Sequence, residues 1–463
     1  MCAASLTDTD TIAAQATPTG RGGIAIIRVS GPQVNFIMQQ VLGCIPAPRQ
    51  ATYLFFRDEN NQTIDEGIAL FFSAPHSFTG EDIFEWHGHG GPVLVDLLLQ
   101  RLLQLGVRLA RPGEFSERAF LNNKMDLTQA EAIADLINAT SVQATRSAMR
   151  SLQGEFSHLI HQLTEELIYL RVYVEAAIDF TDEEIDFLHD EILQTRLTQL
   201  LHRLTLIKDQ AKQSSFLRDG IQVVIAGAPN VGKSSLLNIL AGKEVAIVTD
   251  IPGTTRDVLR DHIVIDGMPV HVMDTAGLRE TVDVVEQEGI RRAHQALEDA
   301  DLILYVMDAR DAPACDIENN LEKISQNFSE RPIIFIRNKI DLLNGVVDVT
   351  IENNNKNKYV VISLSVKTRA GISELLQQIK TSVGFLGNEE NNIFLARRRH
   401  LDALARAQQH LQAAHAQLCS AAPSSELAAE ELRLAQAALG EITGEVTSDD
   451  LLGRIFSSFC IGK

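Results

Sequence analysis

A glycine-rich loop between a buried-strand pattern and a helical pattern constrains the fold more than any other feature of the chain. The apolar run Val223–Ala226 precedes Gly227-Ala-Pro-Asn-Val-Gly232-Lys233-Ser234, and a helical pattern begins at Lys233. In this context the glycines let backbone N–H groups turn inward around phosphates, and the helix N-terminus adds a favourable dipole. The Lys233 ammonium is expected to reach the β/γ-phosphate oxygens, and the Ser234 hydroxyl to bind magnesium. The segment therefore predicts a nucleoside triphosphate site.

Strand and helix patterns around this loop predict a doubly wound, mostly parallel sheet. Buried-strand patterns alternate with helical patterns, as in folds whose helices cover both faces of a parallel sheet. The asparagine-rich segment 344–358 is predicted to be a loose surface loop. The strand patterns are Leu302–Val306, Ile333–Ile336 and Tyr359–Ile362, and the helical patterns are Lys233–Leu240, Glu286–Ala296 and Gly371–Ser382.

Helical patterns on both sides of this α/β domain, which is assigned to residues 216–384, predict that it is inserted into an α-helical domain. Residues 119–215 and 385–463 carry apolar residues at helical spacing, and neither segment offers a sheet that could bury them. The simplest arrangement is that the two halves pack together, and two independent bundles are the alternative. At the start of the first half, Thr128 and Glu131 have the spacing of a capping box.

Residues 1–118 form a third region with mixed patterns. Strand patterns at Ile24–Val29 and Ile68–Phe72 are separated by Gly and Pro, and a helical pattern follows at Leu94–Leu105. A small α+β domain is therefore predicted here. The expected fold is multidomain α/β, with the P-loop domain inserted in an α-helical domain and preceded by this small α+β domain.

The charge of the chain limits how it could bind nucleic acid. Its 463 residues contain 41 Lys and Arg against 61 Asp and Glu, a formal net charge of −20. Proteins that depend on phosphate-backbone contacts are normally basic, so a nucleic-acid partner would be bound by a local patch, through another protein or weakly. The best local patch is Arg397-Arg-Arg-His400, which is more simply interpreted as a solvated helix start.

Three further features favour a cytoplasmic protein. No apolar run reaches the length of about eighteen residues that a membrane span requires. Met1–Thr11 lacks the basic and apolar regions of a secretion signal. The five cysteines are scattered without a CxxC pair, which indicates free thiols in a reducing compartment.

Later motifs identify the base of the nucleotide. Asp274-Thr-Ala-Gly277 follows the strand pattern Val270–Met273, where a magnesium-linked acid and an N–H for the γ-phosphate are needed. In Asn338-Lys-Ile-Asp341, the Asp341 carboxylate can accept two hydrogen bonds from the guanine edge. Adenine offers no such pair of donors, and leaving the acid unpaired would cost roughly 2–5 kcal/mol. Ser365-Val366-Lys367 is expected to be a second base-contacting loop.

Together these motifs resemble the GTPase superfamily. That superfamily usually has alanine at the position of Val366, a difference of little consequence because the contact is expected from the backbone. Many small GTPases place a glutamine after the DTAG motif to orient the attacking water, but this chain has Leu278, so another residue must take that role. Thr255 is expected to close over magnesium together with Ser234. The residues expected to bind GTP are Asn230, Val231, Gly232, Lys233, Ser234, Ser235, Thr249, Thr254, Thr255, Asp274, Thr275, Ala276, Gly277, Asn338, Lys339, Asp341, Ser365, Val366 and Lys367.

Several additional motifs narrow the resemblance. In the α/β domain and at the end of the chain they are Asn230, Gly253-Thr-Thr-Arg-Asp257 and Cys460-Ile-Gly-Lys463. In the first region they are Asp10-Thr-Ile-Ala-Ala14, Gly20-Arg-Gly-Gly23, His87–Gly91 and Arg111–Leu121. With the three-part layout, these motifs are similar over nearly the whole chain to the tRNA-modifying GTPase family known as MnmE (or TrmE).

For GTP hydrolysis, the resemblance implies a potassium ion beside the β/γ-phosphates, bound by Asn230, Thr249, Ile251 and Thr254. The ion would take the place of an arginine finger, which is worth about 10³–10⁵ in rate. In this family the G domains pair to close the site. Glu286 matches the residue that positions the attacking water, directly or through a second water, and the alternative is a solvated acid at a helix start.

For the first region, the resemblance implies a folate-binding domain that holds the chain in a constitutive homodimer. Arg28, Glu85, Lys124 and Lys463 match the positions that contact a tetrahydrofolate derivative. Cys460 matches a cysteine needed for tRNA modification, and an inert thiol is the alternative. We therefore expect catalytic roles for Lys233, Glu286 and Cys460. A metal pair at His87 and His89 is not expected, because no third ligand cluster is visible and the glycines indicate a tight turn before a helix.

The implied activity is a GTPase that acts with a separate FAD-containing partner, in a heterotetramer. The pair would add an aminomethyl-type group, such as carboxymethylaminomethyl, to carbon 5 of the wobble uridine of certain tRNAs, which are expected to be held largely through the partner. Two alternatives remain. One is a ribosome-assembly or regulatory GTPase without modification chemistry, and the other is a folate-dependent aminomethyltransferase that merely carries a GTPase.

Overall fold

The computed structural model describes residues 10–179, 191–241, 260–274, 300–310, 332–343, 345–353, 358–385, 394–419, 424–446, 449–460 and 462. The chain divides into two compact units. Unit 1 comprises Met1–Ala134, Leu152–Ala176 and Ala429–Lys463, and unit 2 comprises Asp135–Ser151 and Ala177–Ala428. Within the described ranges, none of the helices combines the length and the apolar character that a membrane span requires.

Unit 1 begins with a six-stranded, largely antiparallel sheet of order β3-β4-β5-β2-β1-β6. Helices α1 (Val34–Leu42) and α2 (Pro92–Gln104) pack on one face of this sheet and bury Phe56, Phe84 and Trp86 beneath them. This arrangement confirms the predicted α+β region. The strands are β1 (Ile12–Gln15), β2 (Gly22–Ser30), β3 (Thr52–Arg57), β4 (Thr63–Phe72), β5 (Ile83–Gly90) and β6 (Arg108–Leu109).

Five helices follow in unit 1 or extend from it. Helix α14 buries Ile455 and Phe456, which pack with Phe459 against Leu127 and Ala130 of α4. The last helix of the chain is thus in contact with a helix from the first half of the helical segments. The helices are α3 (Glu114–Leu121), α4 (Leu127–Asn138), α6 (Glu155–Asp179), α13 (Ser425–Thr443) and α14 (Asp449–Ser457).

The predicted cap of α4 is wrong by two residues. The Asp126 carboxylate accepts the Gln129 N–H at 2.9 Å, and the Gln129 side chain accepts the Asp126 N–H at 3.0 Å. This reciprocal pair is a capping box two residues earlier than Thr128 and Glu131. Thr128 lies inside the helix instead, where its hydroxyl contacts Ser157 at 2.6 Å.

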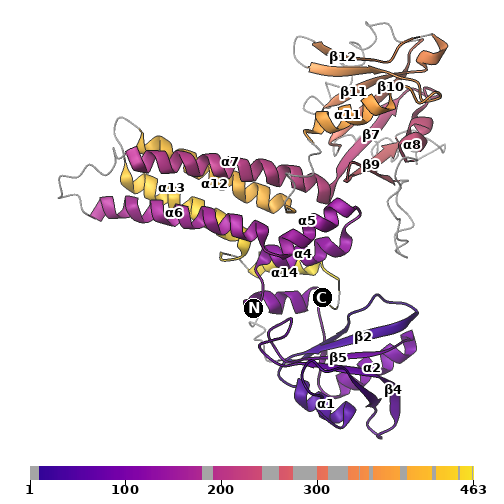
Figure 1. The fold of residues 1–463 in the computed structure, drawn as a ribbon, viewed down its shortest axis with the longest axis vertical. Helices are drawn as coiled ribbons and strands as arrows, with labels where there is room; N and C mark the ends of the chain where they lie inside the picture. Colours follow the sequence, from indigo (N-terminus) through magenta and orange to yellow (C-terminus); the bar gives the residue numbers. More distant parts are fainter. Residues whose placement is uncertain are drawn as a thin grey trace, which may run out of the picture. The chain divides into compact units, whose positions relative to one another are not determined.

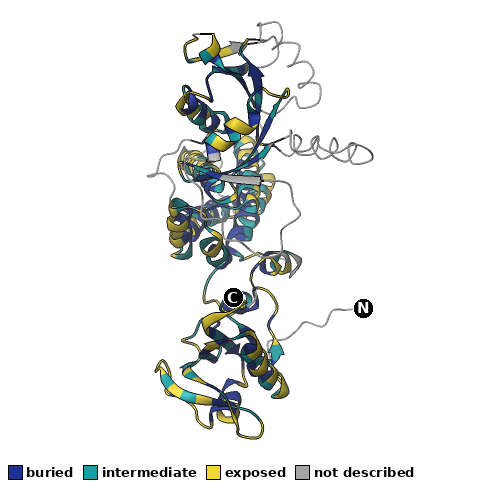
Figure 2. Cartoon of the chain, turned by 90° about the vertical axis from the view of Figure 1, so that its right-hand side faces the viewer, coloured by how far each residue is buried: buried dark blue, intermediate teal, exposed yellow. Residues whose placement is uncertain are grey.

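Unit 2 contains a seven-stranded sheet of order β12-β13-β11-β10-β7-β9-β8, whose central strands are buried (Figure 2). The five inner strands are parallel, and the two edge strands β12 and β8 are antiparallel to their neighbours. The predicted doubly wound sheet is therefore confirmed. The strands are β7 (Ile221–Gly227), β8 (Arg260–Ile265), β9 (Met268–Asp274), β10 (Leu302–Asp308), β11 (Ile333–Asn338), β12 (Asp348–Asn353) and β13 (Lys358–Ser363).

Part of the predicted surface loop 344–358 is an edge strand. Within this segment, β12 pairs with β13 along its whole length, from Asp348 opposite Ser363 to Asn353 opposite Lys358. Pairing with a buried neighbour decides this structure, and the local composition does not reveal it. The predicted helix Glu286–Ala296 lies outside the described residues.

Helices before and after the inserted sheet pack against each other in unit 2. Helix α7 (Glu191–Asp219) leads into β7, and α12 (Arg398–Leu418) follows the sheet; the two lie side by side (Figure 1). Lys208 donates to Gln408 at 2.7 Å, and Gln408 donates to Thr205 at 2.9 Å. The P-loop domain is thus inserted in an α-helical domain, as predicted. Its limits at residues 216 and 384 stay a prediction. Among the described residues of unit 2, the other α-helices are α5 (Val142–Leu152), α8 (Lys233–Ala241) and α11 (Ile372–Val383).

Candidate functional site

The phosphate loop connects β7 to α8, and its shape depends on two glycines. Gly227 has φ +142°, and a Cβ there would lie 2.1 Å from the Val306 carbonyl oxygen. Gly232 has φ +103°, and its Cβ would lie 2.4 Å from the Asn338 amide nitrogen. A larger residue would displace strand β10 at the first position, or the base loop Asn338–Asp341 at the second. The shape of the phosphate loop therefore requires glycine at both positions.

Lys233 begins α8 with its ammonium folded back over the phosphate loop. The Lys233 Nζ donates to the carbonyl oxygens of Gly227 at 3.0 Å and Ala228 at 2.8 Å, and the side chain is buried. A buried cation held by loop carbonyls keeps a positive charge where an anionic ligand of the loop would lie. Ser234 and Ser235 follow on the first turn of the same helix.

Asn338, at the end of β11, ties three predicted nucleotide loops together. Its amide nitrogen donates to the Val231 carbonyl at 2.8 Å, in the phosphate loop. Its side-chain oxygen accepts the N–H groups of Lys339 at 2.8 Å and Val366 at 3.0 Å. The side chain is buried, so these bonds are protected from water. The backbone N–H of Val366, a residue expected to contact the base, therefore donates to Asn338 in this structure.

Asp341, the last residue of the base loop Asn338–Asp341, lies in a short 3-10 turn, Ile340–Leu342. One oxygen of its carboxylate accepts the Ser365 hydroxyl at 2.6 Å, and the Ser365 hydroxyl in turn accepts the Thr368 N–H at 3.2 Å. Each carboxylate oxygen has two lone pairs, so this fixed carboxylate can still accept two further hydrogen bonds. Lys367, the last residue of the predicted second loop, is exposed.

Asp308 is a site residue that the sequence analysis missed. It ends β10 and is buried, and its carboxylate accepts the Lys339 ammonium at 2.8 Å. Hydrogen bonds from Arg310 and then from Lys339 hold the pKa of the Asp308 carboxyl well below its usual range, against the opposing effect of burial. Its position at the carboxyl end of a central parallel strand was the one available signal.

The remaining predicted residues of this site are not in the described part of the chain. Thr249, Ile251, Thr254, Thr255, Thr275, Ala276, Gly277 and Glu286 lie outside it. The backbone of Asp274 ends β9 opposite Ile225 of β7, at the same end of the sheet as the phosphate loop. Within the described ranges, no group of three or more His, Cys, Asp or Glu side chains could hold a metal ion.

A second candidate site in unit 1 is built around Arg28 and Glu85, which face each other on β2 and β5. The Arg28 Nε donates to the Glu85 carboxylate at 2.8 Å, and both side chains are partly exposed. The Arg28 guanidinium lies over the rings of Phe78 at 5.4 Å and Phe115 at 5.6 Å. An ion pair flanked by two aromatic rings suits a planar, polar ligand.

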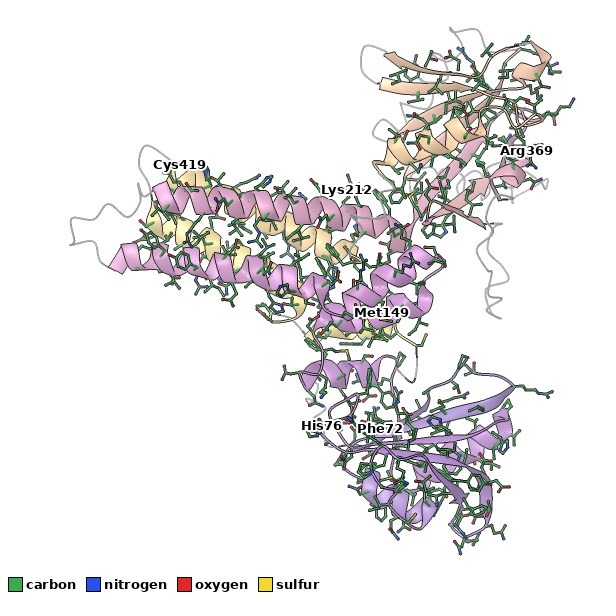
Figure 3. The ribbon with its side chains drawn as sticks, in the orientation of Figure 1. Phe72, His76, Met149, Lys212, Arg369 and Cys419 are labelled. Atoms are coloured by element: carbon green, nitrogen blue, oxygen red, sulfur yellow. The ribbon has the colours of Figure 1, made fainter. Side chains whose placement is uncertain are left out.

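The segment after α14 is bound next to this ion pair. Arg28 Nη1 donates to the Gly462 carbonyl at 3.5 Å, and the Gly113 N–H donates to the Cys460 carbonyl at 3.4 Å. A Cβ on Gly462 would lie 2.4 Å from the Gln15 carbonyl oxygen, so the segment fits tightly against β1. Cys460 is a free, exposed cysteine, as are Cys44 and Cys419, the latter directly after α12 (Figure 3).

Lys124 and Lys463 complete the predicted folate set. The Lys124 Nζ donates to the Pro75 carbonyl at 2.9 Å, and its stem lies beside Gly80. Lys124 thus borders the loop that carries Phe78, whose ring lies under Arg28. Lys463 lies outside the described residues. The structure brings Arg28 and Glu85 into contact, and connects Lys124 to them through that loop.

His87 and His89 lie in strand β5, which corrects the predicted tight turn before a helix. Each histidine is paired with a carboxylate: His87 contacts Glu85 at 3.2 Å, and His89 contacts the buried Asp65 at 2.8 Å. The hydrogen bond to Asp65 raises the pKa of His89. The neighbouring glycines serve close packing in the strand, since a Cβ on Gly88 would lie 2.0 Å from the Asp65 carboxylate.

Comparison with known proteins assigns the segment with the first candidate site and the segment with the second to one family. Residues 127–460 match the model described as the MnmE helical domain, and residues 11–124 match the GTP-binding protein TrmE N-terminus. The chain is 58% identical over 455 residues to the tRNA modification GTPase MnmE of Coxiella burnetii (strain Dugway 5J108-111), covering 98% of this chain and 99% of that protein. It is also 58% identical over 457 residues to the protein of the same name from Proteus mirabilis (strain HI4320), covering 98% of this chain and 99% of that protein. The chain therefore belongs to the MnmE (TrmE) family.

Proposed function

We propose that this chain is a GTP hydrolase that takes part in tRNA modification. The observation that carries the proposal is the hydrogen bonding of the Asn338 side chain, which donates to the phosphate loop and accepts from the base loop and the Ser365 loop. Lys233 lies at the phosphate end of this assembly and Asp341 at its base end. Relatives of the same family and nearly the same length are named tRNA modification GTPases.

Hydrolysis requires charge stabilisation and an oriented water. The phosphate-loop N–H groups and Lys233 neutralise charge that develops on the β/γ-phosphate oxygens. Magnesium fits the Ser234 hydroxyl on the first turn of α8, with Thr255 as its second protein ligand. Potassium fits the Asn230 amide oxygen, with Thr249, Ile251 and Thr254 as the other ligands. Glu286 orients the attacking water.

The modification proposed is that of the wobble uridine. With an FAD-containing partner in a heterotetramer, the chain adds a carboxymethylaminomethyl or aminomethyl group to carbon 5 of that base in certain tRNAs. The one-carbon unit comes from a tetrahydrofolate derivative bound by Arg28, Glu85, Lys124 and Lys463. A pterin ring presents adjacent N–H donors that a carboxylate such as Glu85 can accept, and the acidic tail of folates attracts cations.

The uncovered face of the unit 1 sheet supports a homodimer. Tyr53 and Ile68 are cross-strand neighbours on the face opposite α1 and α2, and they are 62% and 41% exposed. Phe55 continues this face along β3 at 41% exposed. A contiguous apolar sheet face of this kind typically marks an interface. Sedimentation equilibrium at micromolar concentration tests the proposal, and a monomer mass would exclude it.

Replacing Arg28 tests the folate site. Arg28→Ala removes a charged hydrogen bond and the ring contacts, so the affinity for a stable tetrahydrofolate derivative should fall by about 10- to 100-fold by calorimetry. GTP affinity should stay unchanged, because Arg28 lies in the other unit. Arg57→Ala, on the same sheet and over the Phe55 ring, is the matched control and should bind folate normally. Equal folate binding by wild type and Arg28→Ala would refute the assignment.

Cys460→Ser separates the two activities. The Cys460 thiol is exposed beside the candidate folate site, so its removal should abolish wobble-uridine modification in cells while GTP turnover by the purified protein continues. Nucleoside analysis of tRNA measures the first, and phosphate release the second. Cys419→Ser is the control for an exposed cysteine in the other unit. Normal wobble-uridine modification in cells that carry Cys460→Ser would show that the thiol has no role in the chemistry.

A further inference from the structure

The Asp308 carboxylate connects the base loop to the phosphate loop through one lysine. Lys339 Nζ donates to Asp308 at 2.8 Å and to the Asn230 carbonyl oxygen at 2.8 Å. Asn230 belongs to the phosphate loop, whereas Lys339 belongs to the base loop. The lysine side chain therefore crosses the interval between the two loops. Any nucleotide that has its phosphates at Lys233 and its base at Asp341 must lie along this side chain.

Backbone strain makes these contacts more important. Lys339 has φ +70° and Asn230 has φ +60°, in the left-handed region that is uncommon for residues other than glycine. Such conformations persist only when the surrounding contacts impose them. The Lys339 ammonium joins these two left-handed residues directly, because it comes from one and is bound by the carbonyl of the other.

The burial of the Asp308 carboxylate strengthens its interaction with the Lys339 ammonium. Asp308 is 6% exposed, and its carboxylate also accepts Arg310 Nη2 at 2.8 Å and Nε at 3.0 Å. Arg310 is half exposed, whereas the Lys339 side chain is 28% exposed and lies between the two loops. The buried carboxylate thus has Arg310 toward solvent and Lys339 toward the nucleotide loops, which holds the lysine in a single position.

We propose that Asp308 is a positioning residue for the guanine nucleotide, which acts by fixing the Lys339 side chain between the phosphate loop and the base loop. This inference rests on the proposed GTP-binding function and adds a residue to that site. Asp308 itself need not touch the nucleotide. Because Asp308 already orders the long, flexible Lys339 side chain, the nucleotide binds without the entropy cost of ordering it.

Asp308→Asn is the central variant, because it keeps the size of the side chain and removes its charge. We expect the Kd of GTP and of GDP to rise by about 10- to 100-fold, the range for loss of one charged hydrogen bond. The KM for GTP should rise in parallel, with a smaller change in kcat, because the lysine is placed against the bound nucleotide in ground state and transition state alike. Asp308→Glu should restore part of the affinity.

Two further measurements distinguish positioning from a general loss of structure. Lys339→Met should weaken GTP binding, and Asp308→Asn combined with Lys339→Met should be no weaker than Lys339→Met alone, since both act through one contact. Asp301→Asn is the matched control, an exposed carboxylate just before the same strand that accepts the Gln222 N–H at 2.8 Å, and it should bind GTP like wild type.

The outcomes separate the inference from the function on which it rests. Wild type that does not bind GTP overturns the proposed function. Wild type that binds GTP while Asp308→Asn binds it equally well overturns the positioning role alone. Fully additive effects of Asp308→Asn and Lys339→Met on the Kd of GTP would show that Asp308 serves only the fold of β10. The same conclusion would follow if Asp308→Asn lowered both the Tm and the affinity for GTP and Asp308→Glu restored neither.

Discussion

Asn230→Gly is expected to abolish the potassium stimulation of GTP hydrolysis and leave a slow rate that is the same in potassium and sodium. In the proposed site the Asn230 amide oxygen is a potassium ligand, and the ion replaces an arginine finger worth about 10³–10⁵ in rate. The Asn230 backbone carbonyl accepts a hydrogen bond from Lys339 at 2.8 Å, which holds the backbone from which the side chain projects. Steady-state phosphate release in KCl and NaCl of equal concentration measures the effect.

The choice of glycine excludes backbone strain as the cause. Asn230 has φ +60°, which asparagine and glycine tolerate but alanine tolerates at a cost of about 1–2 kcal/mol. Asn230→Gly removes the amide without strain, and Asn230→Ala removes it with strain. Loss of stimulation in both variants assigns the effect to the ligand, and loss in Asn230→Ala alone assigns it to the backbone. Equal wild-type rates in the two salts would discard the cation mechanism.

The sequence was informative where chemistry depends on consecutive residues. The phosphate loop and Asn338–Asp341 are short segments whose glycine, lysine and carboxylate positions follow from the ligand, so their strand–loop–helix context could be read directly. The structure adds that one side chain, Asn338, joins them. The site is thus more tightly connected than separate motifs indicate.

The features that the sequence did not reveal depend on distant partners. Strand β12 forms because β13 offers an edge to pair with, and position 88 of strand β5 is glycine because Asp65 leaves no space for a side chain. The pair of Asp308 and Lys339 joins residues 31 positions apart, one at the end of β10 and the other directly after β11, and no local pattern marks the pair. Arg28 and Glu85 are 57 positions apart, and only the family resemblance indicated them.

Asp341→Asn is expected to exchange the base preference from guanine to xanthine. Guanine presents two neighbouring N–H donors, which an ionised carboxylate accepts and an amide cannot accept together. Loss of one charged hydrogen bond and an unfavourable donor–donor contact should raise the Kd of GTP by about 10²–10³-fold. Xanthine has a carbonyl in place of the guanine amino group, so the amide NH₂ of asparagine can donate to it. Competition between GTP and XTP for the purified protein measures the exchange.

Ser365 is expected to orient the side-chain amide of the Asp341→Asn variant. Its hydroxyl donates to one oxygen of Asp341 at 2.6 Å, and an asparagine there would keep its oxygen on Ser365 and turn its NH₂ toward the base. Ser365→Ala should therefore weaken the gain in XTP binding by Asp341→Asn more than it weakens wild-type GTP binding. Asp348→Asn, an exposed carboxylate on the edge strand β12, is the control and should keep the preference for GTP. If Asp341→Asn still prefers GTP to XTP, this carboxylate does not select the base, and guanine recognition must reside elsewhere in the chain.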